Sequence, residues 1–363
     1  MTTSILAEGG KLGLKSARFM ESAAYTDDLV SESFRRSFHV TEDDQGQRLD
    51  RIVAAHCPEL SRTRVQELIA EGLALLNGKA SKGSHKLHAG DVVEIVAQER
   101  PALRAEAENI PLDILYEDDD VLAVNKPTGM SVHAGAGNSR GTLVNALLGR
   151  GQSLSEGGDA LRPGIVHRLD KETSGIVLVA KNDFAHAKLS EAFRQREIRK
   201  TYLALVQGEL KEEHGRIELA IARDPKRRTR MTAKRASLLA HAREARTDWR
   251  MLCRIDSTSL LEIDLHTGRT HQIRVHFAAL RHPVVGDTLY GAAEKLHVGH
   301  ALLPSLGRNF LHAAKIRFAQ PRTGQSIQLT AALPGELREY LARMAALVGD
   351  SLARIDAALK GFL

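Results

Sequence analysis

Apolar residues recur at helical spacing in the first part of the chain and predict two short helices. The first is expected in QRLDRIVAAHC, where every third or fourth position faces inward. Its inner face comprises Leu49, Ile52, Val53 and His56. A second helix follows Ser61, a favourable N-cap residue, and stops at Gly72, which tolerates the left-handed conformation. The inner face of this second helix comprises Val65, Leu68 and Ile69.

Strand and turn signals complete a small unit around these helices. Asn77 and Gly78 form a dipeptide typical of a tight hairpin turn, and residues 92–96 read VVEIV, a short strand. Two helices and a small sheet predict a compact module over residues 38–97. Residues 1–37 have no apolar segment followed by a small-residue cleavage site, so we expect a flexible N-terminal arm and not a signal peptide.

The pattern changes after a polar segment, residues 98–110, which contains Pro101 and is expected to be a linker. From residue 111 to residue 363 strand and helix patterns are mixed, as in an α+β domain. ILYEDDDVLAVNKP predicts a hairpin whose acidic tip, Glu117–Asp120, is expected to be solvated. Further strands are expected in IVLVAK, RKTYLALVQG and LLEIDLH, and a helix over residues 183–196.

Two helical segments are expected nearer the C-terminus. Thr270 is predicted to cap a helix. The inward residues of that helix are Ile273, Phe277 and Leu280. After Pro334 the chain predicts one or two amphipathic helices that pack on the core. Their apolar stripe comprises Leu337, Leu341, Met344 and Leu347.

Composition narrows the class of protein. The formal net charge is +6, and residues 221–250 hold ten Lys and Arg against three acids, a net of +7 that leaves −1 for the rest of the chain. This basic segment indicates either a polyanion partner or a solvated loop. No apolar run approaches the length of a membrane span, so we expect no membrane association. The two cysteines, Cys57 and Cys253, cannot build a thiolate metal site, and they fit a reducing cytoplasm.

Three segments carry candidate chemistry. NKPTGMSVHAGAGNSRGT lacks the spacing of a phosphate-binding glycine loop, which argues against a nucleotide cofactor. HRLDKETSG places Asp170 beside fixed cations, as in a nucleophile or base, although a salt-bridged turn has the same residues. In HTGRTHQIRVHFAALRHPVVGDTLYG the histidines are five residues apart, a spacing that does not favour zinc. Arg269 and Arg274 lie near a helix start, where they could reach an anion or be surface charge.

Together these segments resemble the large-subunit-rRNA class of pseudouridine synthases, the RluA/RluD-like family. The resemblance rests on VNKPTGMSVHAGAG, RPGIVHRLDKETSGIVLVAK, EIRKTYLALVQG and LHTGRTHQIRVHFAALRHPVVGDTLYG, and it runs from about Pro111 to Phe318. It implies an α+β catalytic fold with a central mixed, mainly antiparallel sheet. It also implies isomerisation of specific uridines to pseudouridine, in 23S rRNA or, as an alternative, in tRNA.

The module over residues 38–97 separately resembles the S4-type RNA-binding domain, through SRTRVQELIAEGLALLNGK and GDVVEI. The residues that this resemblance implies for RNA contact are Arg62, Arg64, Lys79 and Lys82. An S4-type domain favours large-subunit rRNA over tRNA. The expected partner is therefore structured RNA, bound by a cytoplasmic protein that we expect to be a monomer.

The catalytic family implies a role for each of four residues. Asp170 would be the catalytic carboxylate, Tyr202 would lie against the flipped base and assist proton removal, and Arg274 would pair with Asp170. Arg168 would fill the space left when the uridine flips out of its stack, which costs a few kcal/mol. The reaction is an isomerisation, so no cofactor or metal is expected.

Two rival functions remain at this point. A non-catalytic RNA-binding protein of the same fold would have lost at least one of Asp170, Tyr202 and Arg274, and the sequence keeps all three. A glycoside hydrolase would use Asp170 with Glu172, but carboxylates two residues apart on a turn usually diverge. That rival also leaves the S4-like module unexplained.

Overall fold

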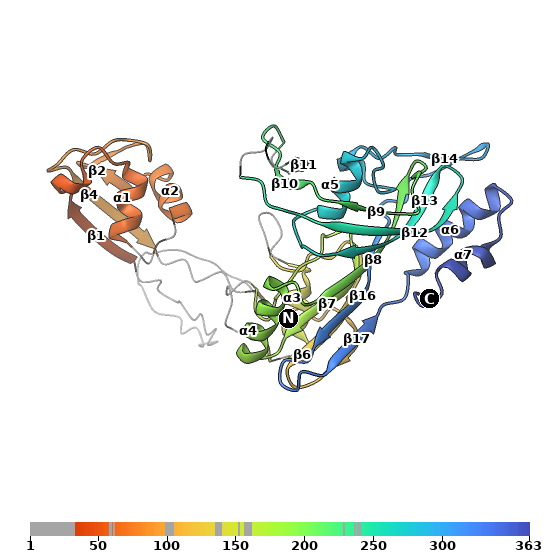
Figure 1. Cartoon of the computed structure of the whole chain (residues 1–363). Coiled ribbons are helices and arrows are strands. Elements are labelled where there is room, and N and C mark those ends of the chain that lie inside the picture. The colour runs from red at the N-terminus through yellow and green to blue at the C-terminus, as the bar shows by residue number, and fades with distance from the viewer. Residues whose placement is uncertain are drawn as a thin grey trace, which may run out of the picture. The chain divides into compact units, whose positions relative to one another are not determined.

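The chain forms two compact units, Met1–Ala102 and Leu103–Leu363 (Figure 1). The computed structural model describes residues 33–57, 60, 62–98, 105–134, 140–151, 153–155, 162–227, 229–235, 237 and 241–363. Among the described residues, no helix is both long enough and apolar enough to cross a bilayer.

The first unit packs two helices on a four-stranded antiparallel sheet in the order β1-β4-β2-β3. Its elements are β1 (Ser33–His39), α1 (Leu49–His56), α2 (Arg62–Ala70), β2 (Ala74–Leu76), β3 (Lys79–Ala80) and β4 (Val92–Gln98). The predicted inward residues of both helices belong to its core, except His56, which stacks on Phe38 with ring centroids 4.2 Å apart. Asn77 and Gly78 both have positive φ, as the predicted hairpin turn requires, and Gly72 ends α2 in the left-handed conformation.

The predicted N-terminal arm, residues 1–37, extends too far along the chain. Residues 33–37 belong to β1, which pairs with β4 from Ser33 opposite Gln98 to His39 opposite Val92. The segment SFRRSFH has few apolar residues, so its own pattern is weak. Hydrogen bonding to β4 at the sheet edge makes it a strand, a tertiary effect that the local sequence does not carry.

A nine-stranded sheet forms the centre of the second unit, in the order β5-β6-β7-β16-β8-β13-β12-β9, with β17 also paired to β16. The strands are β5 (Asp113–Glu117), β6 (Val121–Lys126), β7 (Ser174–Ala180), β8 (Arg199–Gln207), β9 (His214–Ile217), β12 (Thr247–Ile255), β13 (Thr258–Leu265), β16 (Leu311–Ala319) and β17 (Ser326–Thr330). The β7–β16 pair is parallel and the other described pairs are antiparallel. The predicted mixed, mainly antiparallel sheet is confirmed.

Helices and two small hairpins surround this sheet (Figure 1). The helices are α3 (Leu143–Gly149), α4 (Asp183–Arg194), α5 (Gln272–Ala279), α6 (Gly335–Leu347) and α7 (Leu352–Ala358). The hairpins are β10 (Ala220–Arg223) with β11 (Met231–Lys234), and β14 (Leu296–Val298) with β15 (Ala301–Leu303). Buried residues of α5, α6 and α7 share one core with the sheet, so the C-terminal helices complete the catalytic unit.

The start of α5 differs from the prediction. Its N-cap is His271, with a left-handed φ of 56°, and not Thr270. Ile273 and Phe277 are buried as expected, but Leu280 is 40% exposed because the helix ends one residue earlier. In this conformation His271 Nδ1 lies 2.8 Å from the hydroxyl of Tyr290. Leu347, at the end of α6, is also exposed rather than packed inward.

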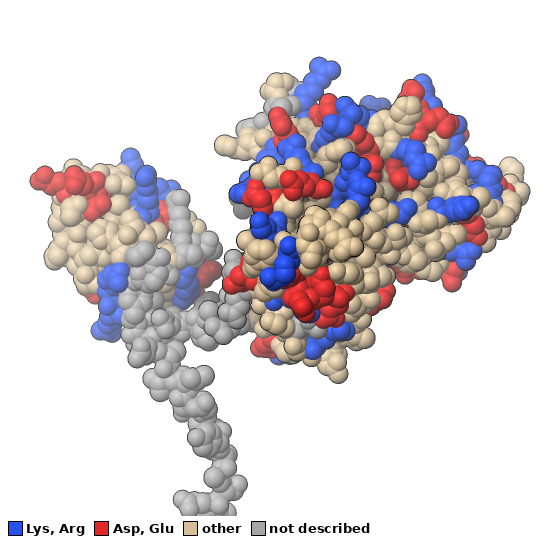
Figure 2. All heavy atoms as spheres, turned by 60° about the horizontal axis from the view of Figure 1, so that its bottom comes forward, with Lys and Arg blue, Asp and Glu red and all other residues tan. Residues whose placement is uncertain are grey.

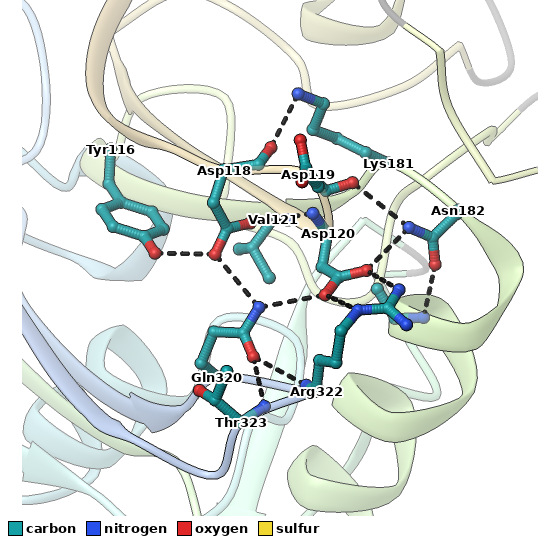
Figure 3. A network of polar contacts seen from close by, with 11 residues as sticks. Tyr116, Asp118, Asp119, Asp120, Val121, Lys181, Asn182, Gln320, Arg322 and Thr323 are labelled. Atoms are coloured by element: carbon teal, nitrogen blue, oxygen red, sulfur yellow. Dashed lines mark hydrogen bonds and ion pairs between the residues drawn. The ribbon is translucent and has the colours of Figure 1, made fainter.

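The tip of the β5–β6 hairpin is only partly solvated: Glu117 and Asp119 are exposed as predicted, whereas Asp120 is buried (Figure 3). Its carboxylate accepts hydrogen bonds from Arg322, Gln320 and Asn182 at 2.7–3.0 Å. These hydrogen bonds, led by that of Arg322, lower the pKa of Asp120 to about 2. The network joins the hairpin to the start of α4 and to the β16–β17 turn, which explains a buried charge at a tip.

The basic segment 221–250 is spread over the β10–β11 hairpin, the chain that follows it and β12. On the face of the molecule drawn in Figure 2, basic side chains are distributed widely over the second unit and acidic ones gather among them. Charge alone therefore does not mark one uninterrupted RNA surface on this face.

Candidate active site

The catalytic loop, residues 167–173, enters β7 through a tightly packed glycine. Gly175 has a φ of +114°, and a Cβ atom there would lie 2.3 Å from the backbone oxygen of Ala313 in β16. This close approach is allowed to glycine alone. It fixes the loop against the neighbouring strand at the point where β7 and β16 run in parallel.

A buried lysine holds the same loop from the other side. The Lys126 ammonium donates hydrogen bonds to the carbonyl oxygens of Pro127, Met130 and Lys171 at 2.7, 2.9 and 3.2 Å. The Gly129 N–H also donates to the Lys171 carbonyl, at 2.9 Å. The NKPTGM segment and the catalytic loop are thus joined through the backbone. Burial, followed by the charge of Arg308, lowers the pKa of Lys126 to about 7.

Asp170 pairs with a guanidinium that a second carboxylate holds in place. Arg274 Nη1 donates to Asp170 Oδ2 at 3.0 Å, and its Nε and Nη2 donate to both oxygens of Asp287 at 2.6 and 2.9 Å. The side chains of Asp287 and Arg274 are 1% and 9% exposed. Although burial opposes the charge, the hydrogen bonds and charges of Asp287 and Asp170 raise the pKa of Arg274. Arg274 therefore presents a permanent, oriented cation to Asp170.

A second chain of contacts reaches Asp170 through His271. His271 Nε2 lies 4.0 Å from Asp170 Oδ2, and His271 Nδ1 lies 2.8 Å from the hydroxyl of Tyr290. That hydroxyl accepts a hydrogen bond from the backbone N–H of Met231 in β11, at 2.9 Å. With this bond accepted, the Tyr290 hydroxyl can donate to Nδ1, which leaves the proton of the neutral imidazole on Nε2, facing Asp170. Burial is the main cause of the lowered pKa of His271, which favours this neutral form.

Asp170, His271 and Arg274 border one cavity of about 330 Å³, a size suited to a small ligand. Asp170, Arg274, Tyr202 and Arg168 all line it, so the structure brings together the four residues predicted for the catalytic centre. Burial, and next the charge of Asp170, raise the pKa of Tyr202. Its phenol is therefore neutral near pH 7. Arg168 is exposed, as a side chain that contacts RNA must be.

The four residues predicted for RNA contact in the first unit have different settings. The side chain of Arg62 lies outside the described residues. Arg64 forms ion pairs with Glu67 and Glu71 along α2, whereas Lys79 is exposed on β3. Lys82 is exposed and lines a hollow of about 650 Å³ that also contains Arg48 and the buried Asp50. Neither Arg64 nor Lys79 lines this hollow.

Sequence reasoning missed three residues that support the site. Asp287 and Tyr290 lie in the quoted GDTLYG segment, and Lys126 lies in NKPTGM, but no role was given to any of them. The signal available was a charged or phenolic residue inside a segment that carries the family resemblance. Their partners are distant in sequence, so contacts were needed to assign their roles.

The alternative chemistries find little support in the geometry. Glu172 accepts a hydrogen bond from the Thr128 hydroxyl at 3.4 Å, while Asp170 faces Arg274, so the two carboxylates have separate partners. The three histidines also separate: His266 contacts Asp248, and His276 contacts Thr247. Among the described residues, no group of three His, Cys, Asp or Glu side chains is arranged to hold a metal ion.

Comparison with known proteins decides the family. Residues 120–279 match the family described as RNA pseudouridylate synthase, and residues 47–93 match the S4 domain. The ribosomal large subunit pseudouridine synthase D of Xylella fastidiosa is 41% identical over 326 residues, which cover 88% of this chain and 95% of that protein. The chain belongs to the RNA pseudouridylate synthase family.

A further relative agrees with this assignment, and one solved structure is also similar to this chain. An uncharacterized RNA pseudouridine synthase of Bacillus subtilis, YlyB, is 39% identical and covers 83% of this chain and 95% of its own. The solved structure of human RNA pseudouridylate synthase domain containing 1 is 26% identical, with a TM-score of 0.48, and covers 66% of this chain and 97% of its own.

This RNA pseudouridylate synthase is thus an isomerase that acts on RNA, with an α+β catalytic domain and an S4 domain. The predicted family, fold class and activity are confirmed. The rival functions, a non-catalytic RNA-binding protein and a glycoside hydrolase, are set aside.

Proposed function

We propose that this pseudouridine synthase isomerises specific uridines of large-subunit rRNA, with Asp170 as the nucleophile. The observation that carries the catalytic part is the geometry of Asp170. Its Oδ2 is held by the buried Arg274, and its carboxylate lies at the wall of a cavity shared with Tyr202. A nucleophile so fixed needs little reorganisation when the substrate arrives.

The reaction proceeds by rearrangement of one nucleotide. Asp170 attacks the flipped uridine, the bond between C1′ and N1 breaks, and the uracil rotates in the cavity. A bond between C1′ and C5 then forms, and Asp170 is released. C5 loses its proton, and N1 gains one. Atoms balance without any added reactant.

The other site residues have supporting roles in this proposal. Arg274 orients Asp170, and Arg168 occupies the stack that the uridine leaves. Tyr202 packs against the uracil. Because the pKa of Tyr202 is raised, its phenol is a poor proton acceptor, which favours the packing role over proton removal.

Large-subunit rRNA is proposed as the substrate for two reasons. The relatives from Xylella fastidiosa and Yersinia pestis are named ribosomal large subunit pseudouridine synthase D. This chain also has an S4 domain, whose Arg62, Arg64, Lys79 and Lys82 we propose as RNA contacts. The division of labour follows the predicted domains: residues 38–97 bind RNA, extended at the start by β1, and residues 111–363 catalyse. We also propose that the protein is a cytoplasmic monomer. The alternative substrate is tRNA.

Pseudouridine mapping of rRNA and tRNA tests this proposal. Cells that lack the protein are complemented with wild type, Asp170→Asn or the matched control Glu172→Gln, whose carboxylate faces Thr128. Wild type and the control should restore the same large-subunit sites, and Asp170→Asn should restore none. Restoration by Asp170→Asn would refute the catalytic role, and loss of tRNA sites alone would refute the substrate.

A further inference from the structure

One cation in the wall of the catalytic cavity lacks an anionic partner. Lys200 lies on β8 two residues before Tyr202, so both side chains extend from the same face of the strand, and both line the cavity. No hydrogen bond or ion pair of the Lys200 ammonium is found within the described part of the chain. The ring of Phe193 lies nearby, with its centroid 5.7 Å from Nζ.

Holding this ammonium without a counter-charge is costly. Burial lowers the pKa of Lys200 to about 8, so the group is still largely protonated near neutral pH. A cation withdrawn from water needs an anion or several hydrogen bonds to recover its hydration energy. An aromatic ring at this distance supplies only part of that.

The surrounding charges are also positive. Arg269 lines the same cavity, and its Nε donates to the backbone carbonyl of Glu244 at 3.1 Å rather than to a carboxylate. Among the described lining residues Asp170 is the one carboxylate, and its Oδ2 already accepts from Arg274. This part of the cavity therefore has spare positive charge and spare N–H donors.

A glycine keeps the amine accessible. Gly268 does not have a positive φ, so its backbone conformation does not require glycine. A Cβ atom there would meet one atom within 4 Å, the Nζ of Lys200 at 3.8 Å. Any larger side chain would therefore extend over the ammonium. Glycine leaves room for a ligand to approach both the amine and the backbone.

We propose that Lys200, Arg269 and Gly268 form a phosphate subsite that holds a backbone phosphate of the flipped uridine nucleotide. This inference rests on the proposed function. Residues two apart on a strand are roughly 6.6 Å from each other. That spacing is comparable to the separation between the base and the phosphate of one nucleotide, so a uracil on Tyr202 brings a phosphate near Lys200. Such a contact sets the register of the RNA without reading its sequence.

The test measures how tightly an RNA hairpin with the mapped target uridine in its loop binds the full-length protein at increasing KCl. Lys200→Met keeps the aliphatic stem and removes the charge. It should weaken binding about 10-fold and reduce the slope of log K against log salt by about 0.7. Lys200→Arg should keep the wild-type slope. The matched control is Arg199→Met, an exposed cation on the opposite face of β8, which should also keep it.

A second arm identifies the anion. Each phosphate next to the target uridine is replaced in turn by a neutral methylphosphonate. One replacement should weaken wild-type binding about 10-fold and leave Lys200→Met unaffected, because both changes remove the same contact. Losses that add at every position, or an unchanged salt slope for Lys200→Met, would overturn the proposal.

A further variant leaves the charge of Lys200 in place. Gly268→Leu covers the Lys200 ammonium without removing it and should reproduce the weaker binding and the shallower slope. Wild-type binding by this variant would overturn the subsite. Failure of the proposed function is seen separately, as wild-type protein that binds the hairpin with the expected slope but forms no pseudouridine in it.

Discussion

Replacing Asp287 with Asn probes the support of the catalytic ion pair. The two side chains have the same size, but the amide carries no charge and offers one acceptor oxygen where the carboxylate offers two. One N–H of Arg274 would then face an NH₂ group. The Asp287 carboxylate is 1% exposed and lies 2.6 and 2.9 Å from the Arg274 nitrogens, so water cannot replace the lost contact.

The expected loss of stability follows from this burial. Removing one partner of a buried ion pair costs about 3–5 kcal/mol. Asp170 remains as a second carboxylate for Arg274, and the amide retains one hydrogen bond, so we expect about 2–3 kcal/mol for Asp287→Asn. The rate should fall as well, because a guanidinium free to turn misplaces Asp170. A misplacement of an ångström lowers the rate about 100-fold.

Urea unfolding monitored by tryptophan fluorescence measures the stability. Trp249 is the single tryptophan of the chain, so its signal reports the second unit alone. Its ring lies 6.3 Å from that of Phe277 in α5, the helix that carries Arg274. Single-turnover pseudouridine formation measures the rate.

A surface ion pair provides the control for this prediction. The Asp356 carboxylate pairs with Arg338, and the two side chains are 27% and 47% exposed. Asp356→Asn should therefore leave both the free energy of unfolding and the rate close to those of wild type. An Asp287→Asn protein as stable and as fast as wild type would refute our account of Arg274. If Asp287→Asn lowered the stability but left the rate unchanged, the role of Asp287 would be structural only.

Three further predictions concern the loop and its supports. Burial lowers the pKa of His312 to about 4, so the stability it contributes is complete above pH 6.5 and is lost as the pH falls from 6.5 towards 4. Urea unfolding at pH 7 and pH 5 should show a smaller difference for His312→Gln than for wild type; an equal difference would assign the effect to another group. Gly175→Ala should lower the free energy of unfolding by at least about 2 kcal/mol, because alanine is strained at this positive φ and its Cβ would clash with Ala313. Gly291→Ala, also at positive φ but in open space, should lower it by about 1 kcal/mol. Equal losses would contradict the packing argument. Tyr290→Phe should slow single-turnover catalysis about fivefold, because His271 loses its hydrogen bond to the Tyr290 hydroxyl. An unchanged rate would exclude a contribution of this hydrogen bond to catalysis.

The sequence predicted the larger elements well because their signals are local. The helices around Leu49 and Leu68, the turn at Asn77 and Gly78, and the hairpin of β5 and β6 all follow from spacing within a few residues. The predicted N-cap of α5, Thr270, was wrong by one residue. There the left-handed His271 is held by contacts to Tyr290, and a local pattern does not contain them.

The predicted β5–β6 tip shows where local reasoning fails. A run of acids indicates solvent exposure in isolation, yet Asp120 is buried by donors from two distant segments. The strand β1 is a similar case, since pairing with β4 decides a segment whose own pattern is weak. In both, the deciding partner is far away in sequence.

By itself, the sequence predicted the α+β class, the S4-like module and the family, and the resemblance to that family implied the four residues that line the cavity. It could do so because motifs and periodicity are properties of adjacent residues. Tertiary structure alone decided that Arg274 is shared between Asp170 and Asp287, that His271 is linked to β11 through Tyr290, and that Lys200 has no carboxylate partner among the described residues. Such facts depend on distances between segments up to 104 residues apart, and the charge and hydrogen bonding at a site are set by those distances.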